Sequence, residues 1–281
     1  MTFYTGLSRR ELFGGLRTPD FNYPPLYTPT DQIYRPLLTT YPAIAPEHWL
    51  LTLMHQDGRR TTLTMDDLRA LHAVDVDCTI CSSASGNDAP MATARWRGVW
   101  LRYLLNDLPS NLRIMSAHGR FVEIPSRLSQ RILLAYRVNG LDLLPEHGAP
   151  LRMIVPGVDD RFMPGWIRRI ELVSSSSEDA SIADSPMRTV IAEPHAAPPS
   201  LPILLGGYAY AGLQPIEQIA LRIDNGEWLP LDFAAGAQGV WSRWSYRWQP
   251  QYPGIYRVQI RAASGDKFAL SERLVRVGTP L

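Results

Sequence analysis

The chain has 281 residues, of which 45% are hydrophobic and 20% are charged, and its formal net charge is +1. This length allows a large core in one or two domains, and the balanced charge argues against a nucleic-acid partner or an anionic membrane surface. No apolar run approaches the ~20 residues that a membrane-spanning helix needs. Arginine supplies 27 of the 28 basic residues, Lys267 being the exception. A GC-rich coding sequence is one explanation of this excess. The alternative is that some guanidinium groups bind oxyanions, because the planar guanidinium matches the geometry of phosphate or carboxylate oxygens.

Residues 1–46 are rich in Pro, Tyr and Thr and show no clear hydrophobic period, which predicts an extended arm lying on a domain. Within it, Ser8–Phe13 resembles a twin-arginine export signal. The Gly- and Pro-containing segment that follows is not the apolar stretch that such a signal requires. We therefore expect a cytoplasmic location, with the periplasm as the alternative.

After the arm, residues 48–64 predict a hairpin that turns at Asp57-Gly58. Thr64 predicts a helix start, because Asp66 and Asp67 would then occupy the electropositive first turn. A strand is expected over 74–81, a loop over 82–94 and a short amphipathic helix over 100–105. Further strands are expected over 114–125, 132–138, 151–157 and 166–173.

The polar, Ser-rich stretch 174–185 is the best candidate for a linker. Residues 187–281 contain short alternating segments broken by Gly and Pro, which favours an immunoglobulin-like β-sandwich. We therefore predict an α+β fold class overall: a mixed α/β domain over 1–180, followed by the sandwich over 187–281.

The two cysteines of the chain, Cys78 and Cys81, lie three residues apart in the predicted strand. Two cysteines exclude a four-cysteine zinc site. A thioredoxin-like dithiol would open a helix, whereas this segment alternates like a strand. Residues i and i+3 of a strand face opposite sides, so only one of the two can point into a given site. Alternatively, both are ordinary small buried residues.

Several segments, taken in order, resemble the sulfite oxidase family of molybdenum–pterin enzymes, and the resemblance covers nearly the whole chain. One group comprises Thr28-Pro29, Pro42, Pro46–Leu51 and then Cys81 with Ala94–Val99. The most specific group comprises Leu133–Gly140, Leu144–Gly157 and Gly165–Ile170. In the last third, Gly207–Gly212 and Trp244–Pro250 resemble the family's dimerisation domain.

The resemblance implies a molybdenum–molybdopterin cofactor, with Cys81 as the protein ligand of the metal. A soft sulfur donor suits such a metal. It also implies that His147 and Arg152 hold the pterin phosphate, and that Tyr34, Arg35 and the tripeptide Met163-Pro164-Gly165 contribute to the cofactor site. The alternative for His147 is a satisfied core histidine.

Two departures from the family argue against sulfite as the substrate. Its N-terminal Arg-Asn-His aligns with Pro36, Leu37 and Leu38, although Arg35 lies one position away. Its active-site tyrosine aligns with Arg120. Arg120 could anchor an anion and His118 could move a proton. Alternatively, both pair with Glu123 or with cofactor phosphate and have no catalytic part.

We therefore expect a molybdenum oxidoreductase that performs two-electron redox chemistry or oxygen-atom transfer on a small, anionic, non-sulfite substrate. Cys81, His118 and Arg120 are its candidate catalytic residues. A separate electron carrier such as a cytochrome and a homodimer formed through the C-terminal domain are the expected partners. The alternative is a non-catalytic subunit that keeps the fold for a structural or interaction role.

Overall fold

The computed structural model describes residues 23–35, 39–82, 90–106, 108, 110–173, 185–193, 196–197 and 202–278. The predicted α+β class is wrong, because most of the regular structure in these residues is β-strand and the α-helices are short. These helices are α2 (Met65–Ala70) and α3 (Ser126–Ser129). The twin-arginine-like segment, most of the predicted linker and the positions Pro36–Leu38 lie outside the described residues.

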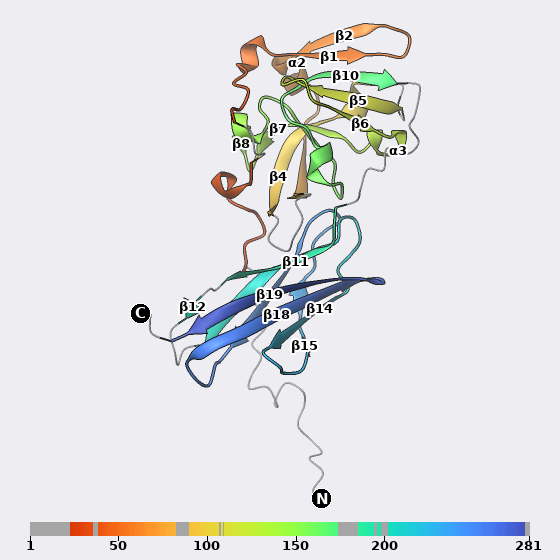
Figure 1. The fold of residues 1–281 in the computed structure, drawn as a ribbon. Helices are drawn as coiled ribbons and strands as arrows, with labels where there is room; N and C mark the ends of the chain where they lie inside the picture. The colour runs from red at the N-terminus through yellow and green to blue at the C-terminus, as the bar shows by residue number, and fades with distance from the viewer. Residues whose placement is uncertain are drawn as a thin grey trace, which may run out of the picture.

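The first sheet has the strand order β2-β1-β10-β5-β6 (Figure 1). Its members are β1 (Leu50–Met54), β2 (Arg60–Thr64), β5 (Asn111–Ser116), β6 (Phe121–Ile124) and β10 (Ile167–Val173). The predicted hairpin is confirmed, since β1 and β2 pair antiparallel. Strand β10 pairs parallel to β1, although more than 100 residues separate them in the sequence. The strand expected over 114–125 is instead the hairpin β5–β6, which turns at Gly119 with φ of 84°.

The second sheet runs β3-β4-β7-β8, and β9 also pairs with β7. Its strands are β3 (Val74–Cys81), β4 (Met91–Trp100), β7 (Leu133–Val138), β8 (Leu141–Asp142) and β9 (Arg152–Ile154). The predicted strand that carries the cysteines is confirmed as β3. Most of β4 was not predicted as a strand. Its first residues lie in the segment 82–94 that is expected to be a loop. In place of the helix expected over 100–105, the structure has one 3₁₀ turn, Leu101–Tyr103.

Helix α2 begins as predicted at Thr64, whose hydroxyl accepts from the backbone N–H of Asp67 while the Asp67 carboxylate accepts from the backbone of Thr64. We expect Thr64→Ala to lower the free energy of unfolding by about 1 kcal/mol, because this cap is lost. Urea denaturation measures the change. Thr64→Ser keeps the hydroxyl and should unfold like the wild type, so equal losses in the two variants would contradict the capping role.

The last third of the chain forms two further sheets, ordered β11-β13-β17-β16 and β12-β19-β18-β14-β15. The first contains β11 (Arg188–Glu193), β13 (Ile203–Tyr210), β16 (Phe233–Ala234) and β17 (Ser242–Trp248). The second contains β12 (Ala196–Ala197), β14 (Gln218–Ile223), β15 (Leu229–Pro230), β18 (Gly254–Ser264) and β19 (Lys267–Val277). One hydrophobic core draws residues from both sheets, Trp244 and Trp248 among them, so the sheets pack face to face.

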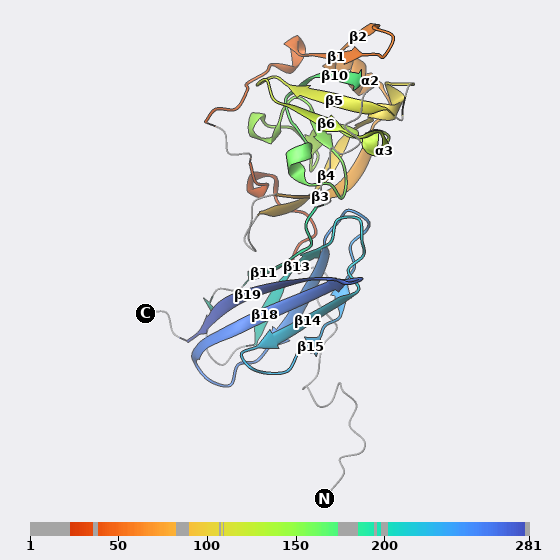
Figure 2. The ribbon, with the colours of Figure 1, turned by 45° about the vertical axis from the view of Figure 1, so that its right-hand side comes forward.

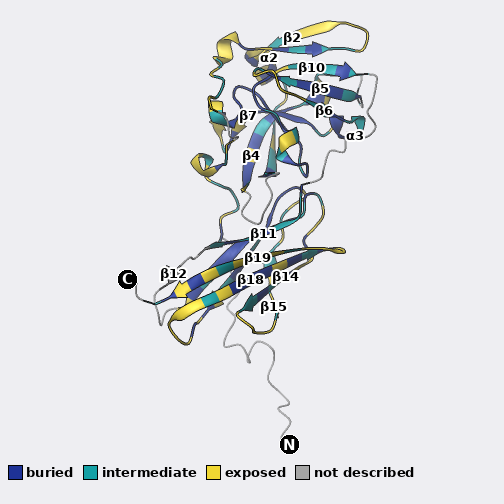
Figure 3. Ribbon diagram, in the orientation of Figure 1, coloured by how far each residue is buried: buried dark blue, intermediate teal, exposed yellow. Residues whose placement is uncertain are grey.

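Figures 1 and 2 show the first two sheets in one body and the last two in a second body, called here the C-terminal unit (residues 185–278). Strand β19 alternates between exposed and more buried residues over Ala269–Val277, as expected for a sheet with one solvated face (Figure 3). The assignment of this unit as an immunoglobulin-like dimerisation domain stays a prediction. Among the described residues, no helix is long and apolar enough to cross a membrane.

Candidate functional site

Cys81 ends strand β3 and lies opposite Met91 of β4. Its side chain is fully buried and packs with Tyr210, Val240 and Trp241 of the C-terminal unit. Burial raises the pKa of the Cys81 thiol to about 11, although the charge of Arg188 and a hydrogen bond from it act in the opposite direction. The thiol therefore ionises at neutral pH only when something positive, such as a metal ion, stabilises the thiolate.

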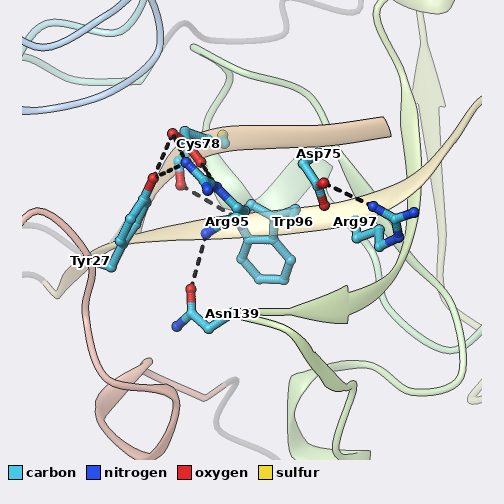
Figure 4. Close-up of polar contacts among 8 residues, drawn as sticks. Tyr27, Asp75, Cys78, Arg95, Trp96, Arg97 and Asn139 are labelled. Carbon is cyan, nitrogen blue, oxygen red and sulfur yellow. Dashed lines mark hydrogen bonds and ion pairs between the residues drawn. The ribbon is translucent and has the colours of Figure 1, made fainter. Parts of the chain in front are cut away.

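Cys78 lies in a different environment from Cys81. It belongs to the core of the first body, and its carbonyl accepts a hydrogen bond from the indole of Trp96 (Figure 4). Burial raises the pKa of its thiol to about 12. Both cysteines are free. Because the two side chains enter separate clusters, the arrangement does not favour a redox dithiol.

Tyr27 of the N-terminal arm contacts the β3–β4 pair at Asp77 of β3 and near Arg95 of β4. Figure 4 shows Tyr27 beside Arg95. The guanidinium of Arg95 donates to the Asp77 carboxylate at 2.9 Å, and the Tyr27 hydroxyl donates to the same carboxylate at 2.7 Å. The hydrogen bond from Arg95 lowers the pKa of Asp77, so this carboxylate is ionised at neutral pH. Asn139 extends the contact by donating to the carbonyl of Thr28. The arm therefore lies along the β3–β4 pair.

His147 and Arg152 form a buried basic pair between the turn Pro145–His147 and strand β9. Arg152 donates to the His147 carbonyl at 3.4 Å and lies over the Trp96 ring, 5.5 Å from its centroid. Within the described residues, His147 Nδ1 and Arg152 Nε have no hydrogen-bond partner, and Arg152 makes no ion pair. Burial lowers the pKa of both groups. Buried donors of this kind fit an anionic group such as a phosphate.

The tripeptide Met163-Pro164-Gly165 packs beside this pair. A Cβ on Gly165 would lie only 2.4 Å from Cα of Gly148, the residue after His147. The Trp166 N–H donates to the Gly148 carbonyl at 2.8 Å, which fixes the approach of the two segments. The structure therefore brings together His147, Arg152 and the tripeptide, all predicted from sequence as cofactor residues.

His118 and Arg120 lie on the exposed turn between β5 and β6. The His118 ring meets the Trp166 ring edge-on at 5.3 Å, which places this turn near Gly165. Partial burial and the charge of Arg120 lower the pKa of His118, so it is neutral at pH 7. Within the described residues no hydrogen bond or ion pair joins either side chain to Cys81. Glu123, the alternative partner, forms an ion pair with Arg113 at 2.8 Å.

Tyr34 points into the site, whereas its neighbour Arg35 does not. The Tyr34 hydroxyl donates to Asp160 at 2.6 Å, and burial together with the charge of Asp160 raises its pKa well above the usual value. The charge of Arg152 lowers the pKa of Tyr34 in turn, so Tyr34, Asp160 and Arg152 share one electrostatic neighbourhood. Arg35 is 46% exposed and pairs with Glu146 at 3.6 Å.

Sequence reasoning missed Asp160 and Arg188. Asp160 lies in the Val-Asp-Asp run directly after Val155–Gly157, which ends a segment that resembles the family. This position could have identified Asp160 as a candidate site residue. Arg188 begins strand β11 of the C-terminal unit and donates to the carbonyl of Ser82 at 3.0 Å. No local pattern connects Arg188 to Cys81, because the two residues are more than 100 positions apart.

These features define a β-rich protein that encloses a cysteine and a buried basic pair suited to a phosphorylated cofactor. The profile of the oxidoreductase molybdopterin binding domain matches residues 38–181. The chain belongs to this family, and its cofactor is accordingly molybdenum held by molybdopterin. Within the described residues, no group of three His, Cys, Asp or Glu side chains could hold a metal alone.

Curated relatives support the same class. Mitochondrial sulfite oxidase of Rattus norvegicus is 23% identical over 270 residues, covering 74% of this chain and 50% of that protein. Nitrate reductase [NADH] 1 of Oryza sativa subsp. japonica is 43% identical over 169 residues, covering 47% of this chain and 18% of that enzyme. The chain thus spans half or less of the length of these curated relatives.

Among solved structures, the sulfane dehydrogenase SoxCD from Paracoccus pantotrophus has a similar fold. The match has a TM-score of 0.73 at 17% sequence identity, and it covers 85% of this chain and 72% of that one. At this level of identity the likeness concerns the fold alone. It extends beyond residues 38–181 of the family match.

Proposed function

We propose that the protein is a molybdenum-dependent oxidoreductase in which Cys81 binds the metal and His147 and Arg152 bind the pterin phosphate. The observation that carries this proposal is the buried guanidinium of Arg152, whose Nε has no partner within the described residues. A buried guanidinium with an unpaired N–H is stabilised by an anion that supplies the missing hydrogen-bond acceptor. The phosphate of molybdopterin is such an anion.

The residues around this cofactor have separable roles in the proposal. Cys81 supplies a soft thiolate ligand, and the glycines at 148 and 165 leave no side chain between the two packed segments. When bound, the cofactor supplies two-electron exchange and oxygen-atom transfer. His118 is neutral at pH 7 and exposed, so it can accept a proton there.

The proposed substrate is a small anion other than sulfite. Sulfite is disfavoured because Arg120 replaces the family's tyrosine and Pro36, Leu37 and Leu38 replace its Arg-Asn-His. A separate electron carrier such as a cytochrome, a homodimer through the C-terminal unit and a cytoplasmic location complete the proposal. The second candidate is a non-catalytic subunit. The replacement of the family's tyrosine and of its Arg-Asn-His favours this candidate.

Metal analysis of the purified protein separates the two candidates. After expression in a molybdenum-replete host, we expect about one molybdenum and one pterin per chain, since a resident cofactor binds the folded protein tightly. Elemental analysis and the fluorescence of the oxidised pterin measure both. Protein from a molybdenum-depleted culture is the control and should melt at a lower temperature. A metal-free protein from the replete host would favour the non-catalytic subunit.

A further inference from the structure

Trp166 directly follows the tripeptide Met163-Pro164-Gly165, and hydrophobic packing does not explain its place in the fold. The side chain is only 3% exposed, yet it belongs to none of the hydrophobic clusters that the described residues form. Its backbone has a φ of 52°, which lies in the left-handed region. Bulky residues rarely adopt this conformation, so the contacts around Trp166 must offset its cost. An outlier of this kind points to a functional role.

Two hydrogen bonds from Trp166 hold the turn that carries His147. The indole N–H donates to the carbonyl of Pro145 at 2.8 Å, and the backbone N–H donates to the carbonyl of Gly148, also at 2.8 Å. Pro145 begins the 3₁₀ turn that ends at His147, and Gly148 follows it. With its left-handed backbone, one residue therefore reaches both ends of this turn.

The His147 imidazole depends on this turn for its direction. Its Nε2 lies 3.4 Å from the carbonyl of Ile33, which is long for a hydrogen bond. Its Nδ1 has no hydrogen-bond partner within the described residues. No short side-chain contact therefore fixes the ring, and its position follows from the backbone that Trp166 holds.

The indole of Trp166 is itself enclosed from two sides. Tyr41 of the N-terminal arm stacks on it, with ring centroids 6.2 Å apart and an interplanar angle of 22°. The His118 ring meets it edge-on, and the Ala117 N–H donates to the Trp166 carbonyl at 2.8 Å. These contacts restrict rotation of the indole, so its N–H stays directed at Pro145.

We propose that Trp166 is a positioning residue that aims the His147 imidazole at the phosphate of the cofactor. The inference rests on the proposed function, in which His147 and Arg152 bind that phosphate. Trp166 would not touch the phosphate, because its two N–H groups are used by Pro145 and Gly148. It acts by fixing the turn before the cofactor arrives, which reduces the conformational freedom lost on binding.

Pterin release from the holoprotein during dialysis tests the proposal. We expect Trp166→Phe to release the pterin about 3- to 10-fold faster than the wild type, because the hydrogen bond to Pro145 is lost and the turn loosens. A second variant replaces Trp166 by benzothienylalanine, whose sulfur takes the place of the indole N–H at nearly the same ring volume. It should show the same increase, and it keeps the test valid where the smaller phenyl ring impairs folding.

Trp49→Phe is the matched control. The buried Trp49 indole donates to the carbonyl of Ile167, the residue after Trp166, also at 2.8 Å. Its replacement removes a hydrogen bond of the same kind in the same body and should leave pterin release unchanged. Equal release from Trp49→Phe and Trp166→Phe overturns the proposal.

The His147→Ala background separates positioning from a general loss of stability. If Trp166 acts through His147, Trp166→Phe should add nothing to the release rate once the imidazole is gone. A general loss of stability would instead add in full in the double variant. Full additivity therefore also overturns the proposal.

Titration of the pterin-free protein with inorganic phosphate gives a readout that does not depend on the cofactor. The NMR signals of the His147 imidazole report binding, and Trp166→Phe should bind phosphate about 3- to 10-fold more weakly than the wild type. Equal affinities, or a wild type whose His147 does not respond to phosphate, overturn the proposal. A wild type purified without pterin would refute the proposed function, and weaker phosphate binding by Trp166→Phe would still support the positioning role.

Discussion

Cys81→Ser is expected to reduce molybdenum content or the sulfur-to-metal visible absorption of the holoprotein at least about 100-fold, because a serine hydroxyl is a poor ligand where a soft thiolate is required. The substitution is nearly isosteric, and the side chain is fully buried, so the change acts at the ligand atom. Elemental analysis and the visible spectrum measure the two effects. Turnover of any substrate that the wild type accepts should fall in parallel.

Cys78→Ser is the matched control for this experiment. Cys78 lies three residues earlier on the same strand, is equally buried, and belongs to the core of the first body. Its replacement puts a hydroxyl into apolar surroundings and should lower stability by about 1–3 kcal/mol while leaving molybdenum in place. Equal loss of molybdenum from both variants would contradict the assignment of Cys81 as the metal ligand.

Arg152→Met is expected to have opposite effects on the two forms of the protein. Without cofactor, the variant should be more stable than the wild type by about 1–3 kcal/mol, because a buried charge with no ion pair in the described residues is replaced by an apolar side chain. With cofactor, the variant should bind the pterin about 10- to 100-fold more weakly, since hydrogen bonds to its phosphate are lost. Thermal unfolding of molybdenum-depleted protein and pterin retention during dialysis measure these effects.

Arg97→Met supplies the comparison for Arg152→Met. Arg97 forms an ion pair with Asp75 at 2.8 Å, and both side chains are more than 40% exposed. Its loss should change stability by less than about 1 kcal/mol and leave pterin binding unchanged. A destabilised apo form of Arg152→Met would mean that the guanidinium is satisfied without the cofactor, and our assignment would then be wrong.

Local patterns predicted the elements that depend on local chemistry. The turn at Gly58, the cap at Thr64 and the alternation in 74–81 each correspond to an observed feature. The predicted helix over 100–105 is wrong because its apolar residues are used differently. Leu101 and Leu105 are buried beyond the end of β4 by tertiary packing, and one 3₁₀ turn is sufficient for this. Short 3₁₀ turns of this kind take the place of longer α-helices in the described residues, and most of the regular structure is β-strand. For this reason the predicted α+β class is wrong.

The candidate site was predictable only in part, for a related reason. His147, Arg152 and Gly165 lie in matched segments that contact each other after short connections, so sequence resemblance identified them. Asp160 contacts Tyr34 and Arg188 contacts Ser82 through tertiary packing that no local period encodes. Arg35 and Arg120 are exposed, and neither makes a described contact with Cys81. Which cations face the buried site therefore depends on the packing of the two bodies.

The docking of the arm on the C-terminal unit constrains the order of assembly during synthesis. The carbonyls of Pro24, Pro25 and Leu26 accept hydrogen bonds from Arg243, Tyr208 and Trp241, across sequence separations of 219, 183 and 215 residues. These partners leave the ribosome long after the arm, and contacts of such separation form late in folding. The arm residues are therefore translated long before the residues that they contact, and they are among the last to reach their native contacts.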